Sequence, residues 1–200
     1  RANAARLLAG QGKYVDDLTL PRMVHVVYYR SPYAHARIVS INDDATRACP
    51  GVIRVVTGKE MAEVCKPWVG VLAHMKGMKS GTQYAMAVER TCWQGEPIVA
   101  VIAHSRAEAE DAVQVLEVEF EELPVLADPE VVLDEGAYVM HPELGNNLLF
   151  EMNHDIGDTA AAFENAAAIV EKTLNFGRHT GVCMEARSII ADYSSSEHRL

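Results

Sequence analysis

The pattern of apolar and polar residues in the first third of the chain predicts three short strands and one helix. The strands are expected where valine, isoleucine and tyrosine gather between turn-prone asparagine, aspartate, proline and glycine residues. Thr57 and Glu60 have the spacing of a capping box, which predicts a helix from Gly58 to about Cys65. Residues 66–88 have no such pattern and are expected to form an exposed loop. The predicted strands cover residues 23–29, 35–41 and 52–56.

The clearest unit is a strand, a helix and a second strand in the middle of the chain. Residues 97–103 form an unbroken apolar run, which is typical of a strand buried on both faces. Ser105 and Glu108 form a second capping box, which predicts a helix that runs to about Leu116. In residues 117–121 glutamates alternate with valine and phenylalanine, as in a half-exposed strand. The residues expected on the buried face of the helix are Ala109, Ala112, Val113 and Leu116.

The last third of the chain has weaker patterns. Residues 127–149 contain proline, glycine and asparagine at short intervals, which indicates a meandering connection and a domain boundary. Asp158 is expected to cap a short helix that reaches Asn165. Residues 168–176 and 188–193 are predicted to be strands of a second unit, which is too short to close its own core.

Length, charge and cysteine content exclude several classes of protein. Two hundred residues with 49% hydrophobic content suffice for one well-cored domain, or for one domain and part of another. The net charge of −10 opposes binding to nucleic acid and to anionic membranes. The four cysteines are widely spaced, which favours small buried side chains in a reducing cytosol over a metal site. A cytoplasmic location is therefore expected, although periplasmic export stays open because the chain begins at Arg1 without Met.

The residues that could carry chemistry favour structural roles when each is considered by itself. Gly10-Gln11-Gly12 has no third glycine and no preceding strand, so a turn is favoured over a phosphate cradle. The eight histidines include no pair four residues apart, and no metal site is predicted. Ser31 and His35 could pair, but the sequence indicates neither an orienting carboxylate nor an oxyanion hole. Glu185 and Arg187 lie among apolar neighbours and are interpreted as a buried ion pair.

Several short motifs follow one another along nearly the whole chain. They are Gly10-x-Gly12-x-Tyr14-x-Asp16-Asp17-x-x-Leu20-Pro21, Arg30-Ser31-Pro32-x-Ala34-His35-Ala36-x-Ile38, Pro50-Gly51-Val52, Gly95-Glu96-Pro97-Ile98-Val99-Ala100-Val101, Ala107-x-Ala109-x-Asp111-Ala112, Val118-x-Phe120-x-x-Leu123-Pro124-Val125, His141-Pro142-Glu143-Leu144-Gly145-x-Asn147, Gly157-Asp158 and Gly181-Val182-x-Met184-Glu185-x-Arg187. In this order they resemble the start of the molybdenum-binding subunit of the xanthine oxidase family. That family includes aldehyde oxidases, aerobic carbon monoxide dehydrogenases and bacterial N-heterocycle hydroxylases. Arg22 departs from the pattern, since relatives commonly carry glycine after Leu-Pro, and this should alter a turn rather than the chemistry.

The resemblance implies a fold, a reaction and a set of partners. The fold class is α+β, with an α/β hammerhead domain over residues 1–149 and the incomplete start of the first molybdopterin-binding domain over residues 150–200. The implied cofactor is molybdopterin, usually as its cytosine dinucleotide in bacteria. The implied reaction oxidises an aldehyde, an N-heterocycle or carbon monoxide with water as the oxygen source. Partner subunits would carry FAD and 2Fe–2S clusters, and the complex would be a dimer of heterotrimers.

The resemblance places the catalytic motifs of the family beyond Leu200. These are a glutamine at the molybdenum centre, a Gly-Gly-Gly-Phe-Gly segment and a late glutamate. No catalytic residue and no metal ligand is therefore predicted within these 200 residues, and the chain alone is expected to bind no cofactor and to be inactive. Glu185 and Arg187 are the residues expected nearest to the cofactor, either as a structural pair or with Glu185 accepting backbone hydrogen bonds beside the molybdenum pocket.

Two alternatives stay open from the sequence. One is a non-catalytic hammerhead module that serves binding or assembly. The other is a small complete hydrolase that uses His35 or Glu185.

Overall fold

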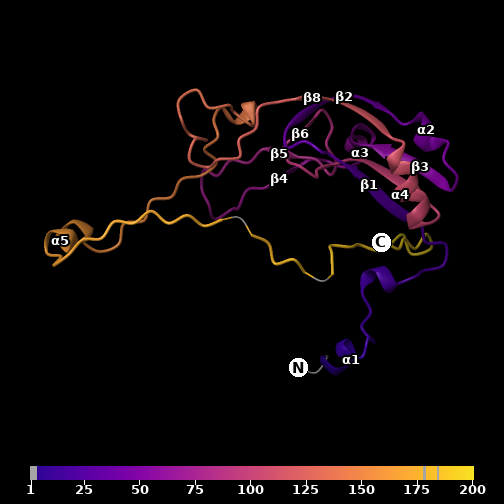
Figure 1. The fold of residues 1–200 in the computed structure, drawn as a ribbon, viewed down its shortest axis with the longest axis horizontal. Coiled ribbons are helices and arrows are strands. Elements are labelled where there is room, and N and C mark those ends of the chain that lie inside the picture. The colour runs from indigo at the N-terminus through magenta and orange to yellow at the C-terminus, as the bar shows by residue number, and fades with distance from the viewer. Residues whose placement is uncertain (1–3, 178, 184) are drawn as a thin grey trace. The chain divides into compact units, whose positions relative to one another are not determined.

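The computed structural model, drawn as a ribbon in Figure 1, describes residues 4–177, 179–183 and 185–200. By its internal contacts the chain divides into two units. One unit comprises residues 24–154. The other combines residues 1–23 with residues 155–200, apart from the positions outside the described ranges. The predicted domain boundary between residues 149 and 150 stays a prediction.

The core of the first unit is a three-stranded antiparallel sheet with strand order β1-β7-β3. Val99 and Val101 on one face of the central strand β7 are buried, and so are Ile98 and Ala100 on its other face. The prediction of a strand buried on both faces is therefore confirmed. The three strands are β1 (His25–Arg30), β7 (Pro97–Ala103) and β3 (Val52–Thr57).

A second antiparallel sheet has the order β6-β2-β8. In β8 the side chains of Val118 and Phe120 are half-buried and pack against the core, while the glutamates between them are exposed, as the alternating sequence predicted. This alternation places apolar side chains on the inner face and leaves carboxylates on the outer one. The strands are β6 (Arg90–Thr91), β2 (Ala36–Asn42) and β8 (Glu117–Glu122).

Helix α4 (Arg106–Gln114) packs against β1 and β7 and completes the core. Ser105 caps it, because its hydroxyl accepts the N–H of Glu108 at 3.3 Å, and this confirms the predicted start. Ala109 and Ala112 have no exposed surface, so the predicted buried face is also confirmed. The residues of the core cluster are Val55, Ala87, Ile98, Val99, Val101, Ala103, Ala109, Ala112 and Leu116.

Helix α3 (Gly58–Val64) begins with the predicted capping box, in which Thr57 and Glu60 exchange hydrogen bonds. The prediction that residues 66–88 form a wholly exposed loop is wrong at its C-terminal end. Met86 and Ala87 are buried, since the Ala87 N–H donates to the Pro97 carbonyl at 2.8 Å and this backbone lies directly against Gly58. The loop also forms the two-residue strands β4 (Trp68–Val69) and β5 (Thr82–Gln83). The short helices α2 (Asp44–Arg47) and η2 (Pro142–Leu144) lie in other connections of this unit.

In the described part of the second unit lie the short helical segments α1 (Ala4–Leu8), η1 (Val15–Asp17) and α5 (Thr159–Glu164). Asp158 caps α5 by accepting the Ala161 N–H at 2.9 Å, as predicted. The predicted strands at 168–176 and 188–193 are wrong, because no strand forms over these described residues. Most of their apolar side chains are exposed, and a strand pattern without a partner strand does not form a ladder.

Cys65 and Cys183 are exposed while Cys49 and Cys92 are half-buried, so the expectation of buried cysteines is wrong for the first two. None of the helices in the described part of the chain is long and apolar enough to cross a membrane.

Candidate functional site

Glu185 and Arg187, the residues expected nearest to a cofactor, do not form a buried ion pair. Both side chains are exposed, and no salt bridge joins them within the described residues. The predicted ion pair depended on a strand that would place both side chains on one face. The prediction is wrong because this segment forms no strand. Met184, the neighbour of Glu185 in the motif, lies outside the described residues.

Glu185 instead binds the N-terminal motif of the chain. Its Oε1 accepts the N–H of Val15 at 2.9 Å, across 170 positions of sequence. The N–H of the preceding residue, Tyr14, donates to Asp17 Oδ2 at 2.9 Å. The carboxylates of Asp17 and Glu185 therefore accept hydrogen bonds from two consecutive backbone N–H groups at the start of η1. The first N–H groups of a helix have no partner within the helix, so these carboxylates satisfy them. Two of the motifs that carry the family resemblance are thus in direct contact.

The glycine pair and Arg22 lie in turns of the same unit. Gly10 has a φ of +69° and follows α1, so the predicted turn is confirmed. Arg22 has a φ of +61° in a turn that is closed by the Met23 N–H and the Leu20 carbonyl at 3.1 Å. This conformation favours glycine, which explains why the departure from the family pattern affects a turn.

Ser31 and His35 are each engaged by other partners. The His35 ring is 1% exposed, and its Nδ1 donates to the Pro124 carbonyl at 2.8 Å. The Ser31 hydroxyl donates to the Tyr33 carbonyl at 2.8 Å. His35 Nε2 has no hydrogen-bond partner among the described residues, so Ser31 does not donate to it. A nucleophile paired with an oriented base is therefore not formed by these two residues.

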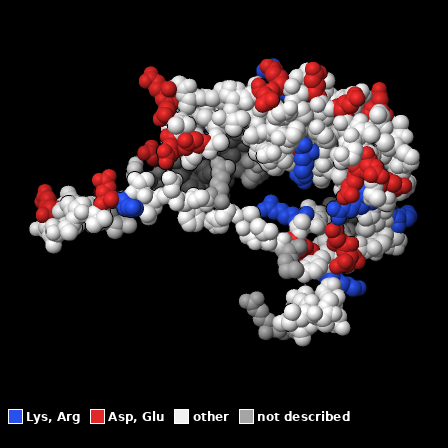
Figure 2. All heavy atoms as spheres, in the orientation of Figure 1, with Lys and Arg blue, Asp and Glu red and all other residues white. Residues whose placement is uncertain are grey.

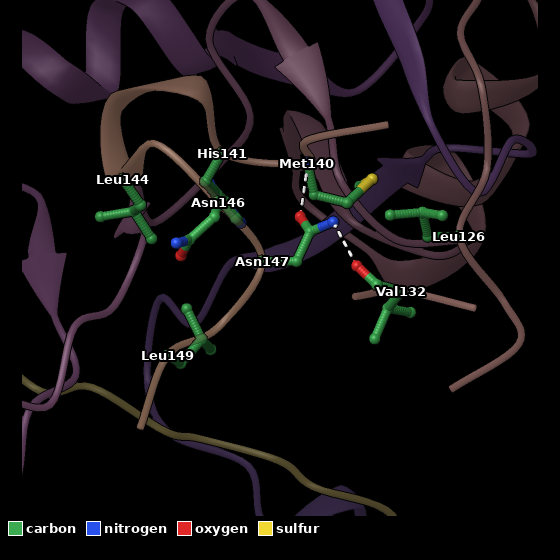
Figure 3. A pocket seen from close by; sticks show the side chains of 8 residues that line it. All are labelled: Leu126, Val132, Met140, His141, Leu144, Asn146, Asn147 and Leu149. Carbon is green, nitrogen blue, oxygen red and sulfur yellow. Dashed lines mark hydrogen bonds between the residues drawn. The ribbon is translucent and has the colours of Figure 1, made fainter. Parts of the chain in front are cut away.

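A pocket of about 200 Å³ lies in the connection between β8 and the end of the first unit (Figure 3). The amide of Asn147 holds this connection in place. Its Oδ1 accepts the Met140 N–H at 3.0 Å, and its Nδ2 donates to the carbonyls of Val132 and Tyr138, both at 2.9 Å. The residues lining the pocket are Leu126, Val132, Met140, His141, Leu144, Asn146, Asn147 and Leu149.

A chain of polar contacts joins the pocket's rim to the strands. His141 Nδ1 lies 3.2 Å from Glu143 Oε1, and Glu143 Oε2 lies 3.5 Å from a terminal nitrogen of Arg90 in β6. Gly81 lies so close to the His141 ring that a Cβ there would be 2.4 Å from it. Only glycine therefore fits at position 81 while the ring holds this place. The Glu143 carboxylate accepts a hydrogen bond from its own backbone N–H and also contacts His141. Both interactions hold the pKa of this carboxyl below its usual value, and the backbone hydrogen bond has the larger effect.

The half-buried carboxyl of Glu96 supports the turn that precedes β7. It accepts the Cys92 N–H at 2.7 Å. Burial raises the pKa of the Glu96 carboxyl above its ordinary value. Burial, with the Glu96 charge beside it, also raises the pKa of the Cys92 thiol. The thiol is therefore kept protonated, which argues against a nucleophilic role for Cys92.

The lining of this pocket does not suit the phosphate of a molybdopterin. The pocket is mainly apolar, and the residues that line it include no lysine or arginine to meet a phosphate. Its volume also falls below the roughly 300–1,000 Å³ of ordinary ligand pockets. Among the described residues no group of three or more His, Cys, Asp or Glu could hold a metal ion. His141 and Asn147, which line this pocket, belong to one of the motifs that carry the family resemblance, but no local sequence pattern indicated what either side chain contacts.

Two models of known protein families match this chain, one after the other along the sequence. Residues 9–124 match the family described as aldehyde oxidase and xanthine dehydrogenase, a/b hammerhead domain. Residues 140–200 match the molybdopterin cofactor-binding domain. An α+β hammerhead domain is thus followed by the start of a cofactor-binding domain, as the resemblance implied. The chain belongs to the aldehyde oxidase and xanthine dehydrogenase family.

Individual relatives agree with this assignment along most of the chain. The nicotine 6-hydroxylase large subunit of Paenarthrobacter nicotinovorans is 36% identical over all of this chain, and the carbon monoxide dehydrogenase large chain of Hydrogenophaga pseudoflava is 32% identical over 94% of it. The crystal structure of quinoline 2-oxidoreductase from Pseudomonas putida 86 matches 85% of the chain with a TM-score of 0.76 and 38% identity. The chain spans 24% of the length of each of the two sequence relatives and 21% of the quinoline 2-oxidoreductase chain.

Proposed function

We propose that this chain is the front part of the molybdenum-binding large subunit of a hydroxylase. The observation that carries the proposal is the order of the two matches, hammerhead residues 9–124 and then cofactor-binding residues 140–200, on one chain. Relatives named as a hydroxylase large subunit and as a carbon monoxide dehydrogenase large chain support the same reading.

The complete protein would oxidise an aldehyde, an N-heterocycle or carbon monoxide and take its oxygen from water. Its cofactor would be molybdopterin, as the cytosine dinucleotide, which supplies the redox chemistry at the carbon centre. Partner subunits would carry FAD and 2Fe–2S clusters and receive the electrons, in a dimer of heterotrimers located in the cytoplasm. Relatives named as a large subunit and as subunit gamma of a complex support the existence of partners.

Within that enzyme, the residues of this chain would support the site without reacting. Residues 24–154 form a well-cored unit whose polar contacts are used for structure, as Asn147 and Glu96 illustrate. Glu185 would act as a positioning residue, because its carboxylate holds the backbone at Val15, in the unit that contains residues 155–200 of the cofactor-binding match.

Metal and pterin analysis of the full-length protein tests the proposal. We expect about one molybdenum and one pterin per large chain, with flavin and iron in the copurified subunits. The 200-residue chain by itself should retain no molybdenum cofactor and show no hydroxylase activity. A full-length protein without molybdenum and pterin would favour the alternative of a non-catalytic hammerhead module.

A further inference from the structure

We propose that residues 64–79, here called the Trp68 loop, form a docking surface for an acidic partner subunit of the complex. The inference rests on the proposed function, because it requires that the full-length protein assembles with other subunits. The loop begins at Val64, the last residue of α3, contains the short strand β4 and ends before the strand β5.

The Trp68 loop exposes several large apolar side chains within a short stretch of sequence. Trp68 is 64% exposed, Val64 is 83% exposed, and Val71 and Leu72 are each 50% exposed. Single exposed apolar residues are ordinary on protein surfaces, whereas a group of them is typical of an interaction site. Tryptophan is also among the residues that contribute most to binding energy at interfaces.

The charge of the loop is opposite to that of the chain. Between Glu63 and Glu89 there is no acidic residue, although the chain has 28 of them and a net charge of −10. Lys66, Lys76 and Lys79 lie in this interval. On the face of the molecule that Figure 2 shows, by contrast, red acidic groups cover more of the surface than blue basic groups do. A basic, apolar loop on an acidic protein is complementary to a partner with acidic side chains around an apolar centre.

The lysines of the loop differ in their contacts with the rest of the chain. The Nζ of Lys79 donates to the Leu144 carbonyl at 3.3 Å, and its backbone N–H donates to the Leu149 carbonyl at 2.8 Å. Lys79 thereby fastens the end of the loop to the rim of the pocket. Lys66 and Lys76 are exposed, and neither forms an ion pair among the described residues. Their charges are therefore available to a partner.

The backbone of the loop is ordered by its own turns. The N–H groups of Val71, Met75 and Met78 donate to the carbonyls of Val69, Leu72 and Met75, at 3.0, 2.9 and 3.2 Å. A surface that is already ordered loses less conformational entropy on binding than a flexible loop does. This order favours a protein partner that recognises a defined shape.

A protein partner fits these observations better than a lipid bilayer does. Lipid-binding clusters commonly contain about 4–8 basic residues, and the net charge of the chain would be repelled by an anionic surface. Relatives whose names describe them as subunits of complexes also favour a protein.

Hydrogen exchange in the native complex provides the first test. The full-length large chain would be purified alone and together with its partner subunits, and exchange would be followed in peptides that cover residues 64–79. We expect fast exchange in the large chain alone and slower exchange in the complex. Slow exchange already in the large chain alone would show that the rest of the same chain covers the loop, and would overturn the proposal. Exchange that is fast in both samples would overturn it as well.

Charge reversal and truncation provide the second test, with subunit affinity as the measurement. We expect Lys66→Glu together with Lys76→Glu to weaken subunit binding by about tenfold or more at low salt, and by less at high salt. Trp68→Ala, at a largely exposed position, should leave folding intact and weaken binding by about tenfold. Lys59→Glu is the matched control, because Lys59 is exposed on α3 outside the loop and should change affinity by less than about twofold. Unchanged affinity in the double variant and in Trp68→Ala would overturn the proposal.

Two further measurements separate the possible failures. Cosedimentation with vesicles of phosphatidylcholine and phosphatidylserine should show no binding, and binding that is lost in the double lysine variant would overturn the proposal in favour of a membrane surface. Molybdenum, pterin and flavin content is measured in the same preparations. Full cofactor content with an exposed loop would contradict only this inference, whereas missing cofactor and partners would contradict the proposed function.

Discussion

Replacing Asn147 by alanine would remove three hydrogen bonds that hold the connection around the pocket. The lost bonds join the Asn147 amide to Met140, Val132 and Tyr138 at 2.9–3.0 Å. At about 0.5–1.5 kcal/mol for each bond, the sum lies between about 1.5 and 4.5 kcal/mol. Because the side chain is only half-buried, water can replace part of what is lost. We therefore expect Asn147→Ala to lower the free energy of unfolding by about 2 kcal/mol.

Urea denaturation of the 200-residue chain measures this change. With a denaturant dependence of about 2 kcal/mol per molar, the midpoint should fall by about 1 M. Asn147→Asp should be more destabilising than Asn147→Ala at neutral pH, since a carboxylate oxygen would then face the carbonyls of Val132 and Tyr138. Asn146→Ala is the control, because this exposed neighbour makes only longer hydrogen bonds of 3.2 and 3.4 Å and should cost less than about 0.5 kcal/mol.

The reasoning would be refuted if Asn147→Ala changed the midpoint no more than Asn146→Ala does. It would also be refuted if Asn147→Asp were as stable as the parent protein. Either result would mean that the amide does not hold the connection as the hydrogen bonds indicate.

Four other substitutions test separate parts of the structure. Ser105→Ala removes the cap of α4 and should cost about 0.5–2 kcal/mol in chemical denaturation. Arg22→Gly should stabilise by up to about 1 kcal/mol, because glycine adopts the φ of +61° without strain. Burial raises the pKa of the Glu96 carboxyl, so the folded protein holds a proton that the unfolded chain has released, and stability falls as the pH rises above the ordinary value of 4.5. Glu96→Gln should remove this fall, and denaturation at a series of pH values measures it. In the full-length enzyme, Glu185→Gln weakens the bond to the Val15 N–H, so it should lower stability or molybdenum content more than turnover per bound molybdenum.

Each of these expectations has a result that contradicts it. An unchanged unfolding midpoint for Ser105→Ala would show that the Ser105 hydroxyl does not stabilise α4 as a cap. A loss of stability in Arg22→Gly would show that the arginine side chain contributes more to stability than the backbone strain costs. A Glu96→Gln variant with the same dependence on pH as the parent would assign that dependence to other groups. A Glu185→Gln enzyme that keeps its cofactor but loses about 100-fold in rate would show a direct catalytic role.

Most elements of the first unit could be predicted because their signals are local. The apolar run of β7 and the capping residues Ser105 and Thr57 specify strand and helix starts from neighbours a few positions away. The buried end of the 66–88 loop could not be predicted, since it depends on Ala87 meeting Gly58 and the Pro97 carbonyl, which are distant in sequence. The expected strands at 168–176 and 188–193 failed for a related reason, because a strand pattern forms a ladder only beside a partner.

For the candidate site, the sequence determined which motifs are present, and through their order it determined the family. The tertiary structure decided what those residues contact. Only the folded chain shows that Glu185 binds the backbone at Val15 instead of pairing with Arg187, and that Asn147 joins three segments of one connection. Helix caps and apolar periodicity act over a few residues, so they can be read along the chain. A hydrogen bond between positions 170 residues apart depends on how the intervening chain packs, and no local pattern carries that information.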